Sequence, residues 1–227
     1  RVMNIGILGT GSVGRALAEG LSHVGHQVQI GTRDPDTTLA RTQPDRFGNP
    51  AISAWLADHS GVRLVNFSEA AAAAELVVNA TSGDVSLLAL EAAGADNLRG
   101  KVLIDVSNPL DFSAGFPPTL FVKDTDSLGE RIQRAFPEAM VVKTLNTMNA
   151  GLMLNPGRLS APSAVFLSGD NPDAKQTVTD LLASFGWQQI VDLGGIATAR
   201  GVEMLMPMWL QVMSVQGGPE FNWAIVT

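Results

Sequence analysis

Six residues near the start of the chain have the types and spacing of a phosphate-binding turn. Gly9-Thr10-Gly11-Ser12-Val13-Gly14 follows the G-x-G-x-x-G pattern and comes directly after the apolar run Val2–Leu8. In such a turn Gly9 permits the tight bend, Gly11 lets the backbone approach a pyrophosphate, and Gly14 lets a helix pack closely on the strand. The helix directs unpaired N–H groups and its positive dipole end towards the anion. The pattern therefore predicts a dinucleotide site.

The residues after the second expected strand, Val28–Thr32, bear on which dinucleotide binds. An acidic residue about 20 positions beyond the glycines binds the 2′-hydroxyl of NAD, whereas an arginine nearby accommodates the 2′-phosphate of NADP. This position holds Thr32, and Arg33 follows it. We therefore expect Thr32 and Arg33 to bind a 2′-phosphate and the cofactor to be NADP(H). A shifted alignment would place Asp34 on the ribose instead, and Arg41 is a second candidate for the phosphate.

Small polar residues follow three further expected strands. In an open α/β sheet, ligands bind beyond the carboxyl ends of the strands. The three segments are Asn79-Ala80-Thr81-Ser82, Ser107-Asn108-Pro109-Leu110 and Lys143-Thr144-Leu145-Asn146-Thr147. Their groups suit hydrogen bonds to a nicotinamide ribose and carboxamide, although asparagine and serine also favour ordinary turns. For Lys143 three interpretations stay open: a base, a phosphate ligand or an edge residue.

Apolar patterns predict the strands that position these residues. The expected strands are Val2–Leu8, Val28–Thr32, Val62–Asn66, Leu76–Ala80, Lys101–Asp105, Met140–Thr144, Ala164–Ser168 and Gln189–Asp192. Helical patterns separate most of them, so we expect an α/β fold with a Rossmann-type, doubly wound, mostly parallel sheet of about eight strands. Residues 1–227 are predicted to form a single NADP-binding domain. A short C-terminal helical addition, about residues 197–227, would complete the ring pocket or a dimer interface.

The helices are expected between these strands, and two long loops interrupt the alternation. The expected helices include Ser12–Val24, Pro50–His59, Phe67–Ala74, Val85–Ala93 and Ala199–Val215, with a kink or break at Pro207. Two more begin at Pro172 and at a capping box formed by Ser127 and Glu130. The segments Asp34–Asn49 and Ser107–Thr125 are expected to be loops, and the length of the second indicates a functional role.

Composition excludes several classes of function. The net charge of −7 and the lack of a basic stripe argue against nucleic-acid binding. There is no cysteine, which excludes thiol chemistry, and no tyrosine, which excludes a Tyr–Lys carbonyl-reductase mechanism. No apolar run reaches the ~18 residues of a membrane helix, and the start lacks signal-peptide features, so we expect a cytoplasmic protein without membrane partners.

No side chain stands out as a catalytic acid or base. His23, His26 and His59 are expected to be structural or on the surface, and no metal-binding spacing is found. Reduction of a carbonyl usually needs a positioned proton donor. Hydride transfer between two redox rings needs mainly alignment and dry packing. We therefore expect direct hydride transfer between two cofactors, without a catalytic side chain or a metal ligand.

The chain resembles the NADP-dependent coenzyme F420 oxidoreductase family over nearly its whole length. The resemblance rests on the segments Asn4–Gly14, Gly31–Pro35, Asp105–Leu110, Val142–Thr147 and Gly169–Asn171. Family members are single Rossmann domains with an extended sheet and a short C-terminal addition, usually dimeric. They transfer hydride between NADPH and the deazaflavin F420. The reductase domain of the eukaryotic metalloreductases is similar and passes electrons to a flavin.

The resemblance implies roles for particular residues. It places Thr10, Ser12 and Val13 in the pyrophosphate turn and Thr32 and Arg33 at the 2′-phosphate. The residues that would line the ring site are Asn108, Pro109, Leu110 and Asn146. Ala80 and Thr81, at the end of the neighbouring strand, are also expected to bind the cofactor. The function expected is NADPH-dependent hydride transfer to F420 or a flavin, in a homodimer. Two alternatives stay open: a reductase of a small carbonyl or imine compound, which would need a larger substrate domain, and a non-catalytic NADP sensor.

Overall fold

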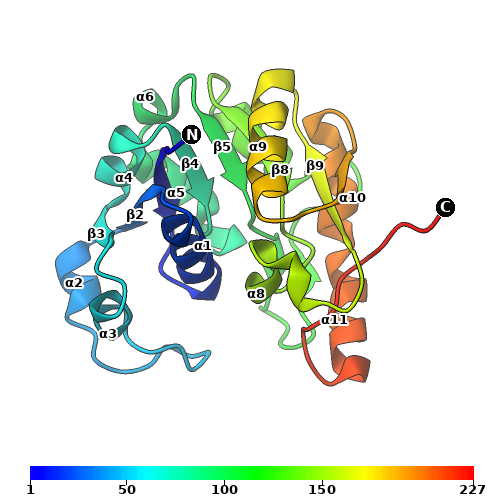
Figure 1. Cartoon of the computed structure of the whole chain (residues 1–227), viewed down its shortest axis with the longest axis horizontal. Coiled ribbons are helices and arrows are strands. Elements are labelled where there is room, and N and C mark those ends of the chain that lie inside the picture. Colours follow the sequence, from blue (N-terminus) through cyan, green and yellow to red (C-terminus); the bar gives the residue numbers. More distant parts are fainter.

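Eight strands form one continuous sheet that runs through the whole molecule (Figure 1). The computed structural model describes residues 1–227. The strands are β1 (Asn4–Leu8), β2 (Gln27–Thr32), β3 (Val62–Asn66), β4 (Leu76–Asn79), β5 (Val102–Asp105), β8 (Met140–Thr144), β9 (Ala164–Ser168) and β10 (Gln189–Asp192). Their order across the sheet is β10-β9-β8-β5-β4-β1-β2-β3. The predicted Rossmann-type α/β fold with an eight-stranded sheet is thus confirmed.

The strand directions create one edge at which six carboxyl ends meet. Strands β1, β2, β3, β4, β5 and β8 are all parallel, whereas β9 pairs antiparallel with β8 and parallel with β10. From β1 the chain first adds β2 and β3 on one side and then returns to place β4 on the other side. This reversal of strand order beside β1 is where open α/β sheets bind ligands.

Helices cover both faces of the sheet. They are α1 (Ser12–His23), α2 (Pro35–Leu39), α3 (Ile52–Ala57), α4 (Phe67–Ala73), α5 (Ser86–Ala93), α6 (Ala95–Leu98), α7 (Leu128–Ala135), α8 (Ala150–Met153), α9 (Pro172–Ser184), α10 (Ala199–Met204) and α11 (Met206–Gln216). Helices α1, α8 and α9 pack on one face, and α4, α5, α6, α7 and α10 pack on the other. None of the helices combines the length and apolar character needed to span a lipid bilayer.

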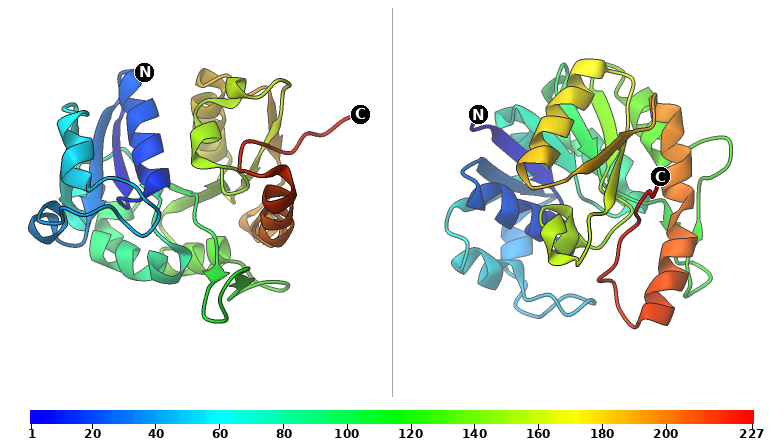
Figure 2. Two further views of the ribbon diagram at one scale, coloured as in Figure 1. Left: turned by 90° about the horizontal axis from the view of Figure 1, so that it is seen from below. Right: turned by 45° about the vertical axis from the view of Figure 1, so that its right-hand side comes forward.

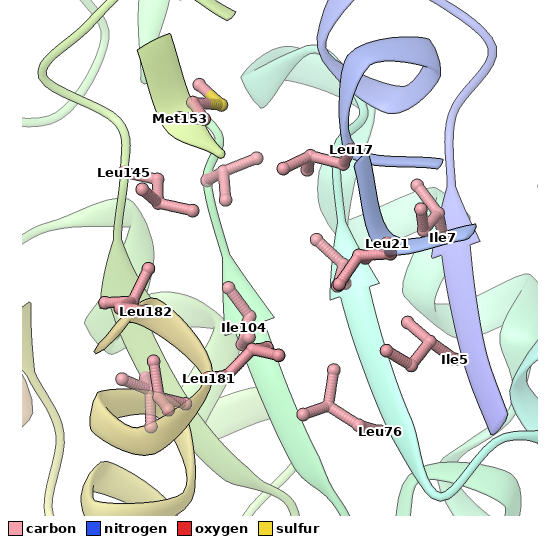
Figure 3. Packing of buried hydrophobic residues seen from close by; sticks show 14 of the residues in the cluster. Ile5, Ile7, Leu17, Leu21, Leu76, Ile104, Leu145, Met153, Leu181 and Leu182 are labelled. Carbon is pink, nitrogen blue, oxygen red and sulfur yellow. The ribbon is translucent and has the colours of Figure 1, made fainter. Parts of the chain in front are cut away.

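The first face holds the larger apolar core. Figure 3 shows Leu17 and Leu21 of α1 in the same cluster as Ile5 and Ile7 of β1, and all four are buried. The periodicity that predicted helix α1 is this buried stripe, because residues four apart lie on the same face of a helix. Along each strand, alternate residues enter opposite cores, as a period of two requires. The sheet is therefore fixed rigidly between two apolar layers.

Two expectations about local structure were wrong in detail, and a third was confirmed. The expected loop Asp34–Asn49 contains α2, which begins at Pro35 because the Asp34 side chain accepts hydrogen bonds from the first-turn amides. The expected loop Ser107–Thr125 contains a small antiparallel hairpin, β6 (Leu110–Asp111) and β7 (Thr119–Leu120), which projects from the sheet (Figure 2). The break expected at Pro207 is confirmed: the helical segment Ala199–Val215 is divided into α10 and α11, since Pro207 has no N–H to continue the helix.

The capping box predicted at α7 is only half formed. Ser127 Oγ accepts a hydrogen bond from the Glu130 amide at 3.1 Å. The Glu130 carboxylate, however, accepts from Ser127 Oγ and from Arg200 and does not reach back to the Ser127 amide. A competing charged partner from α10 therefore takes the carboxylate that a reciprocal box requires.

The C-terminal addition folds back across the molecule (Figure 2). Trp209 of α11 stacks on Phe221 at 5.3 Å between ring centroids, and Phe221 contacts Trp223 edge-on. The tail is held where the Ala164 amide at the start of β9 donates to the Trp223 carbonyl at 2.7 Å. This small third core also contacts Leu110 in β6, so the C-terminal helices support the hairpin beside the strand ends.

Candidate active site

The glycine turn connects β1 to α1 and needs glycine at each position for a different reason. Gly9 has a φ of 119°, which L side chains rarely adopt, and a Cβ there would lie 2.5 Å from the Ala80 carbonyl oxygen. A Cβ at Gly14 would overlap the Gly9 carbonyl. At Gly11 a Cβ would meet nothing within 4 Å. Gly9 and Gly14 thus build the turn, whereas Gly11 faces the open space that a pyrophosphate would fill.

The N-terminus of α1 carries no side-chain cap. Its N-cap, Gly11, has no side chain to bond the first amides, and the first turn contains no acidic residue. Helices α2, α4, α7 and α9 are capped by the side chains of Asp34, Asn66, Ser127 and Asn171. The free N–H groups and the positive dipole end of α1 are therefore available to an external anion. This arrangement fits the pyrophosphate of a dinucleotide.

Two hollows meet at Gly11, one on each side of the turn. The first, which we call the loop pocket, has a volume of about 490 Å³ and is lined by Thr10, Gly11, Arg15, Thr38, residues 40–45 and residues 50–52. The second, the strand-end cleft, has a volume of about 980 Å³. Its lining consists of residues 11–13, 46–47, 80–84, 87, 106–108, 110–113, 121, 128 and 131. A dinucleotide held at α1 has room for one half in each hollow.

Arg15 joins the glycine turn to the loop that follows α2. Its Nε donates to the Thr10 carbonyl at 2.8 Å, and one terminal nitrogen donates to the Pro50 carbonyl at 2.5 Å. Burial lowers the pKa of this guanidinium, and the nearby carboxylate of Asp45 opposes that effect. Sequence reasoning overlooked Arg15, although its place one residue after the last glycine brings it into the loop pocket.

The segment Arg41–Pro50, which we call the strap, meets the start of α1 at Ser12. Asn49 bonds through its amide nitrogen to Ser12 Oγ at 2.8 Å and to the Asp45 carboxylate at 2.8 Å. The hydrogen bond from Asn49 holds the pKa of Asp45 below its ordinary value. At the tip, Arg46 lies over the Phe47 ring, and both line the strand-end cleft. The strap therefore contributes to both hollows.

The end of β2 gives the expected phosphate residues different environments. Thr32 is buried, and its Oγ1 lies 2.9 Å from Thr38 Oγ1. Arg33 is exposed without an ion pair, and Arg41 lines the loop pocket. The Asp34 carboxylate caps α2 by accepting from the Asp36 and Thr37 amides, and the bonds from Thr37 lower its pKa. Asp34 is thus committed to α2 rather than turned towards the loop pocket.

Hydroxyl and amide groups form a continuous network at the ends of β4 and β5. Asn79 donates to Asp105 Oδ1 at 3.0 Å and accepts from Thr81 Oγ1 at 2.6 Å. Ser107 donates to the same Asp105 oxygen from its Oγ at 2.6 Å and from its amide at 3.1 Å. Thr81 and Ser107 line the cleft, so Asp105 orders its floor from below. Gly83 closes the wall, because a Cβ there would overlap the Asn108 carbonyl.

Asn108 and Asn146 form a pair, but only one of them lines the cleft. The side-chain Nδ2 of Asn108 donates to the backbone carbonyl of Asn146, and Nδ2 of Asn146 donates to Oδ1 of Asn108, both at 2.9 Å. Asn146 is buried behind Asn108 and also donates to the Val202 carbonyl at 3.2 Å. Leu145 before it has a φ of 63°, a strained left-handed conformation for a leucine. Asn146 therefore does not line the strand-end cleft but orients Asn108 from behind it, and its expected place at the ring site stays a prediction.

Lys143 fits none of the three roles considered for it, which were a base, a phosphate ligand and an edge residue. Its side chain is completely buried in the interior strand β8, and Nζ lies 2.9 Å from Asp105 Oδ2 and 3.0 Å from Glu203 Oε2. Burial lowers the pKa of Lys143, but the two carboxylates outweigh burial and raise it overall. A lysine so enclosed cannot reach a ligand as a base or a phosphate contact, and β8 is not an edge strand.

The structure brings together most, but not all, of the residues predicted for the site. Those that line the loop pocket or the strand-end cleft are Thr10, Gly11, Ser12, Val13, Ala80, Thr81, Asn108 and Leu110. Gly9, Gly14, Thr32, Arg33, Pro109 and Asn146 line neither. No residue of the C-terminal addition lines the cleft, and Trp209 instead supports Leu110 from behind. Sequence reasoning missed Leu87, Phe121, Leu128 and Arg131, which long-range folding brings to the cleft.

Comparison with known proteins agrees with this geometry. Residues 4–109 match the family model for NADP oxidoreductase, coenzyme F420-dependent. A crystal structure from Arthrobacter sp. FB24, whose proposed activity is that of an F420-dependent NADP-reductase, is 55% identical with a TM-score of 0.96. It is matched over 99% of this chain and 100% of that one.

Two curated relatives extend the comparison. The F420-dependent NADP reductase of Methanothermobacter marburgensis is 26% identical, with 92% of each chain covered. The metalloreductase STEAP3 of Rattus norvegicus is 31% identical over 90% of this chain, which spans only 37% of that longer protein. The open helix N-terminus, the two hollows that meet at Gly11 and these similarities lead to one conclusion: the chain belongs to the coenzyme F420-dependent NADP oxidoreductase family and is an NADP-dependent oxidoreductase.

Proposed function

We propose that this protein transfers hydride between NADP(H) and a redox ring such as coenzyme F420 or a flavin. The observation that carries the proposal is the strand-end cleft, which opens from the glycine turn at the reversal of strand order. Its volume of about 980 Å³ leaves room for a second ring beside a nicotinamide. The similarity to F420-dependent NADP reductases supports F420 as the partner. A flavin, which the resemblance to the metalloreductase reductase domains implies, is the alternative.

The residues around the cleft have separable tasks. The open amides of α1 hold the pyrophosphate, and NADPH when bound supplies the hydride. Thr81, Ser107 and Asn108 present hydroxyl and amide groups to the nicotinamide half. An apolar surface formed by Leu110, Phe121 and Leu128 excludes water and aligns the second ring. Such a site accelerates hydride transfer by orientation, because neither ring needs a proton donor for the hydride step itself.

The 2′-phosphate contact is proposed at the end of β2. Arg33 has no ion-pair partner within the protein, and Arg41 is an equally unpaired guanidinium in the loop pocket. Thr32 supports the site by fixing Thr38 through the bond between their hydroxyls. We propose Arg33 as the main phosphate ligand and Arg41 as the second.

The test is a hydride-transfer assay with defined acceptors. The protein is mixed with NADPH and oxidised F420, and separately with FMN, and the loss of the acceptor's absorbance band is followed. The proposal predicts turnover with at least one of these rings. The matched controls are Gly11→Ala, which is expected to lose activity, and Gly201→Ala, which also adds a Cβ into open space but lies in α10.

Two results would refute the proposal. Turnover confined to small carbonyl or imine compounds would assign the cleft to a different substrate class. Tight binding of NADPH that shifts the oligomeric state, without turnover of F420 or flavins, would indicate a sensor. Either result leaves the NADP site itself intact, because the loop pocket and the glycine turn are separate from the acceptor region.

A homodimer is also proposed, and the absence of nucleic-acid and membrane partners stays a prediction. Helix α11 contains no charged residue, and Met208 and Val215 on it are 52% and 82% exposed. An apolar helix face of this kind suits a second copy of the chain better than solvent. Light scattering of the protein and of Met208→Glu would test it, since a monomeric wild-type protein would exclude the dimer.

A further inference from the structure

Three charged side chains are buried together behind the strand-end cleft and take no part in the tasks described above. Lys143 of β8, Asp105 of β5 and Glu203 of α10 are 0%, 0% and 1% exposed. The Lys143 ammonium lies 2.9 Å from Asp105, 3.0 Å from Glu203 and 2.5 Å from the Ser107 carbonyl oxygen. All three of its N–H groups therefore have an acceptor. We call these three side chains the buried triad.

The first arm of the triad reaches the floor of the cleft. Lys143 and Asp105 are direct partners in the register of β8 and β5. The second oxygen of Asp105 accepts bonds from Asn79 and Ser107, and Asn79 in turn holds Thr81. The Ser107 backbone is held on both sides of its Cα, because its amide donates to Asp105 and its carbonyl accepts from Lys143.

The second arm reaches the opposite wall. Glu203 accepts from the Leu128 amide at 2.7 Å and from the Gly129 amide at 3.0 Å, and so caps the N-terminus of α7. Gly129 allows this close approach, since a Cβ there would lie 3.2 Å from Ala199 Cβ in α10. Leu128 itself lines the cleft. One lysine thus connects the strand ends on one side of the cleft to the start of a helix on the other.

Energetics suggest a role other than stability. Removing three charges from water costs so much that a buried ion cluster contributes little net stability compared with apolar side chains of similar volume. What such a cluster does fix is the relative position of the groups it joins, because charged hydrogen bonds tolerate little change in distance or angle. The cavity that depends on those positions is the strand-end cleft.

We infer that the buried triad sets the spacing between the floor and the α7 wall of the cleft, which makes Lys143 a positioning residue for hydride transfer. The inference rests on the proposed function, because it assigns the cleft to the nicotinamide and the acceptor ring. Lys143 touches neither ring. It acts through Ser107 and Thr81 on one side and through Leu128 on the other.

The test removes the charges together so that none is left unpaired. The triple variant Asp105→Asn, Lys143→Met, Glu203→Gln keeps the side-chain volumes close to the originals. Its matched control is Lys175→Met, Asp192→Asn, which removes an ion pair of 2.9 Å between α9 and β10, away from the cleft. We expect the triple variant to bind NADPH with an unchanged Kd, while kcat per NADPH-binding site falls about tenfold to a hundredfold because the two rings are misaligned.

A readout that does not need turnover separates this inference from the proposed function. The fluorescence lifetime of the nicotinamide in bound NADPH reports how tightly the ring is held. We expect it to shorten in the triple variant and to stay unchanged in the control. If the wild type fails to reduce F420 or flavins but the lifetime shortens as expected, the proposed function fails and the positioning role stands.

An unchanged lifetime together with an unchanged kcat per binding site would overturn the inference, because a purely structural cluster changes only the folded fraction. If the triple variant does not fold, Glu203→Gln carries the same test with a smaller expected change. It leaves Lys143 paired with Asp105 and alters only the α7 arm. Restoration of the lifetime by Glu203→Asp, which keeps the charge, would then support the positioning role.

Discussion

On the loop side, Arg15 and Asn49 join the strap to the glycine turn, and the other contacts are mostly between neighbours in sequence. The strand-end cleft instead rests on a buried cluster that joins three distant parts of the chain. Asp34 caps α2 through Thr37, three residues away, and Asp45 holds Asn49, four residues away. Behind the cleft, Lys143 meets Asp105 across 38 residues, and Glu203 meets Leu128 across 75. The side chains that line the loop pocket are mostly exposed, whereas Asp105, Lys143 and Glu203 behind the cleft are buried.

This difference suggests a division of labour between recognition and alignment. The exposed arginines of the loop side bind a charged group, which requires attraction but tolerates movement. The buried network of the cleft side holds two walls at a fixed separation, which hydride transfer requires. Changes on the loop side should therefore alter affinity, and changes on the cleft side should alter stability and turnover.

The largest expected effect is on the cleft side, from Lys143→Met alone. This substitution leaves Asp105 and Glu203 buried without their cation, so we expect the free energy of unfolding to fall by about 3–5 kcal/mol. Urea unfolding at pH 7 measures it. On the loop side, Arg41→Ala removes an exposed guanidinium without an ion pair and should change stability by no more than about 0.5 kcal/mol. Equal effects of the two substitutions would contradict the contrast drawn above.

The second prediction concerns Gly11, where the two regions meet. Because a Cβ at Gly11 contacts nothing in the protein, Gly11→Ala should leave stability unchanged or slightly higher. The same Cβ occupies space needed by the pyrophosphate, so we expect the Kd for NADPH to rise about a hundredfold, or ~2.7 kcal/mol. Titration of NADPH fluorescence measures the Kd.

Two other glycines serve as controls for Gly11→Ala. Gly9→Ala should lose both stability and binding, because its φ of 119° and the nearby Ala80 carbonyl exclude a side chain. Gly201→Ala should lose neither. If Gly11→Ala binds NADPH as the wild type does, the pyrophosphate does not lie against this turn.

The contrast between local and long-range contacts also explains how much of each region could be predicted from the sequence. The glycine turn and all eight strands of the sheet were predictable, because local pattern and spacing determine them. Alternation also implies that Asp105 and Lys143 lie on the same face of the sheet as Leu103 and Val141. Nothing local shows that β5 and β8 are neighbours, or that Glu203 returns to them from α10. The buried triad was therefore invisible until the fold was known.

On the loop side, a local pattern was present in the sequence but was not recognised. The first residues of α2 carry a local pattern, an aspartate followed by proline, that predicts a capped helix start. The polar composition of residues 34–49 obscured it. The closure of the strap onto Ser12 by Asn49 joins positions 37 residues apart, and exposed polar side chains have many alternative partners. No spacing rule selects that bond.

The third prediction is an affinity effect on the loop side. Arg33→Ala removes the main proposed phosphate ligand, so the Kd for NADPH should rise roughly tenfold, for a loss of about 1.5 kcal/mol in charge-assisted hydrogen bonding. The Kd for NADH, which lacks the phosphate, should stay the same, and stability should not change, because Arg33 has no partner in the protein. Binding titrations with both dinucleotides provide the measurement.

Arg41→Ala is the matched control for Arg33→Ala, since both are exposed arginines of the same region. A larger loss with Arg41→Ala would reverse their proposed ranks. If Arg33→Ala weakens NADPH and NADH equally, the 2′-phosphate is not bound at this position.

The smallest expected effect compares one carboxylate from each region as the pH falls. The hydrogen bonds from Arg200 hold the pKa of Glu130 below its ordinary 4.5, and the bonds from Thr37 do the same for Asp34. A lowered pKa stabilises the fold above the unfolded value, and the contribution is lost as the pH drops through the folded value. Glu130 joins α7 to α10 across 70 residues. Asp34 holds only the first turn of α2, where asparagine is an equally good cap.

We therefore expect Glu130→Gln to lower the free energy of unfolding at pH 7 by about 1 kcal/mol, and Asp34→Asn to change it little. The difference between Glu130→Gln and the wild type should shrink as the pH falls below 4.5, because the unfolded wild type takes up a proton there while the folded protein keeps its charge until the pH reaches the lowered pKa. Urea unfolding at pH 7 and at pH 3.5 measures both variants. A difference independent of pH would mean that Glu130 acts through packing rather than through its ion pair with Arg200.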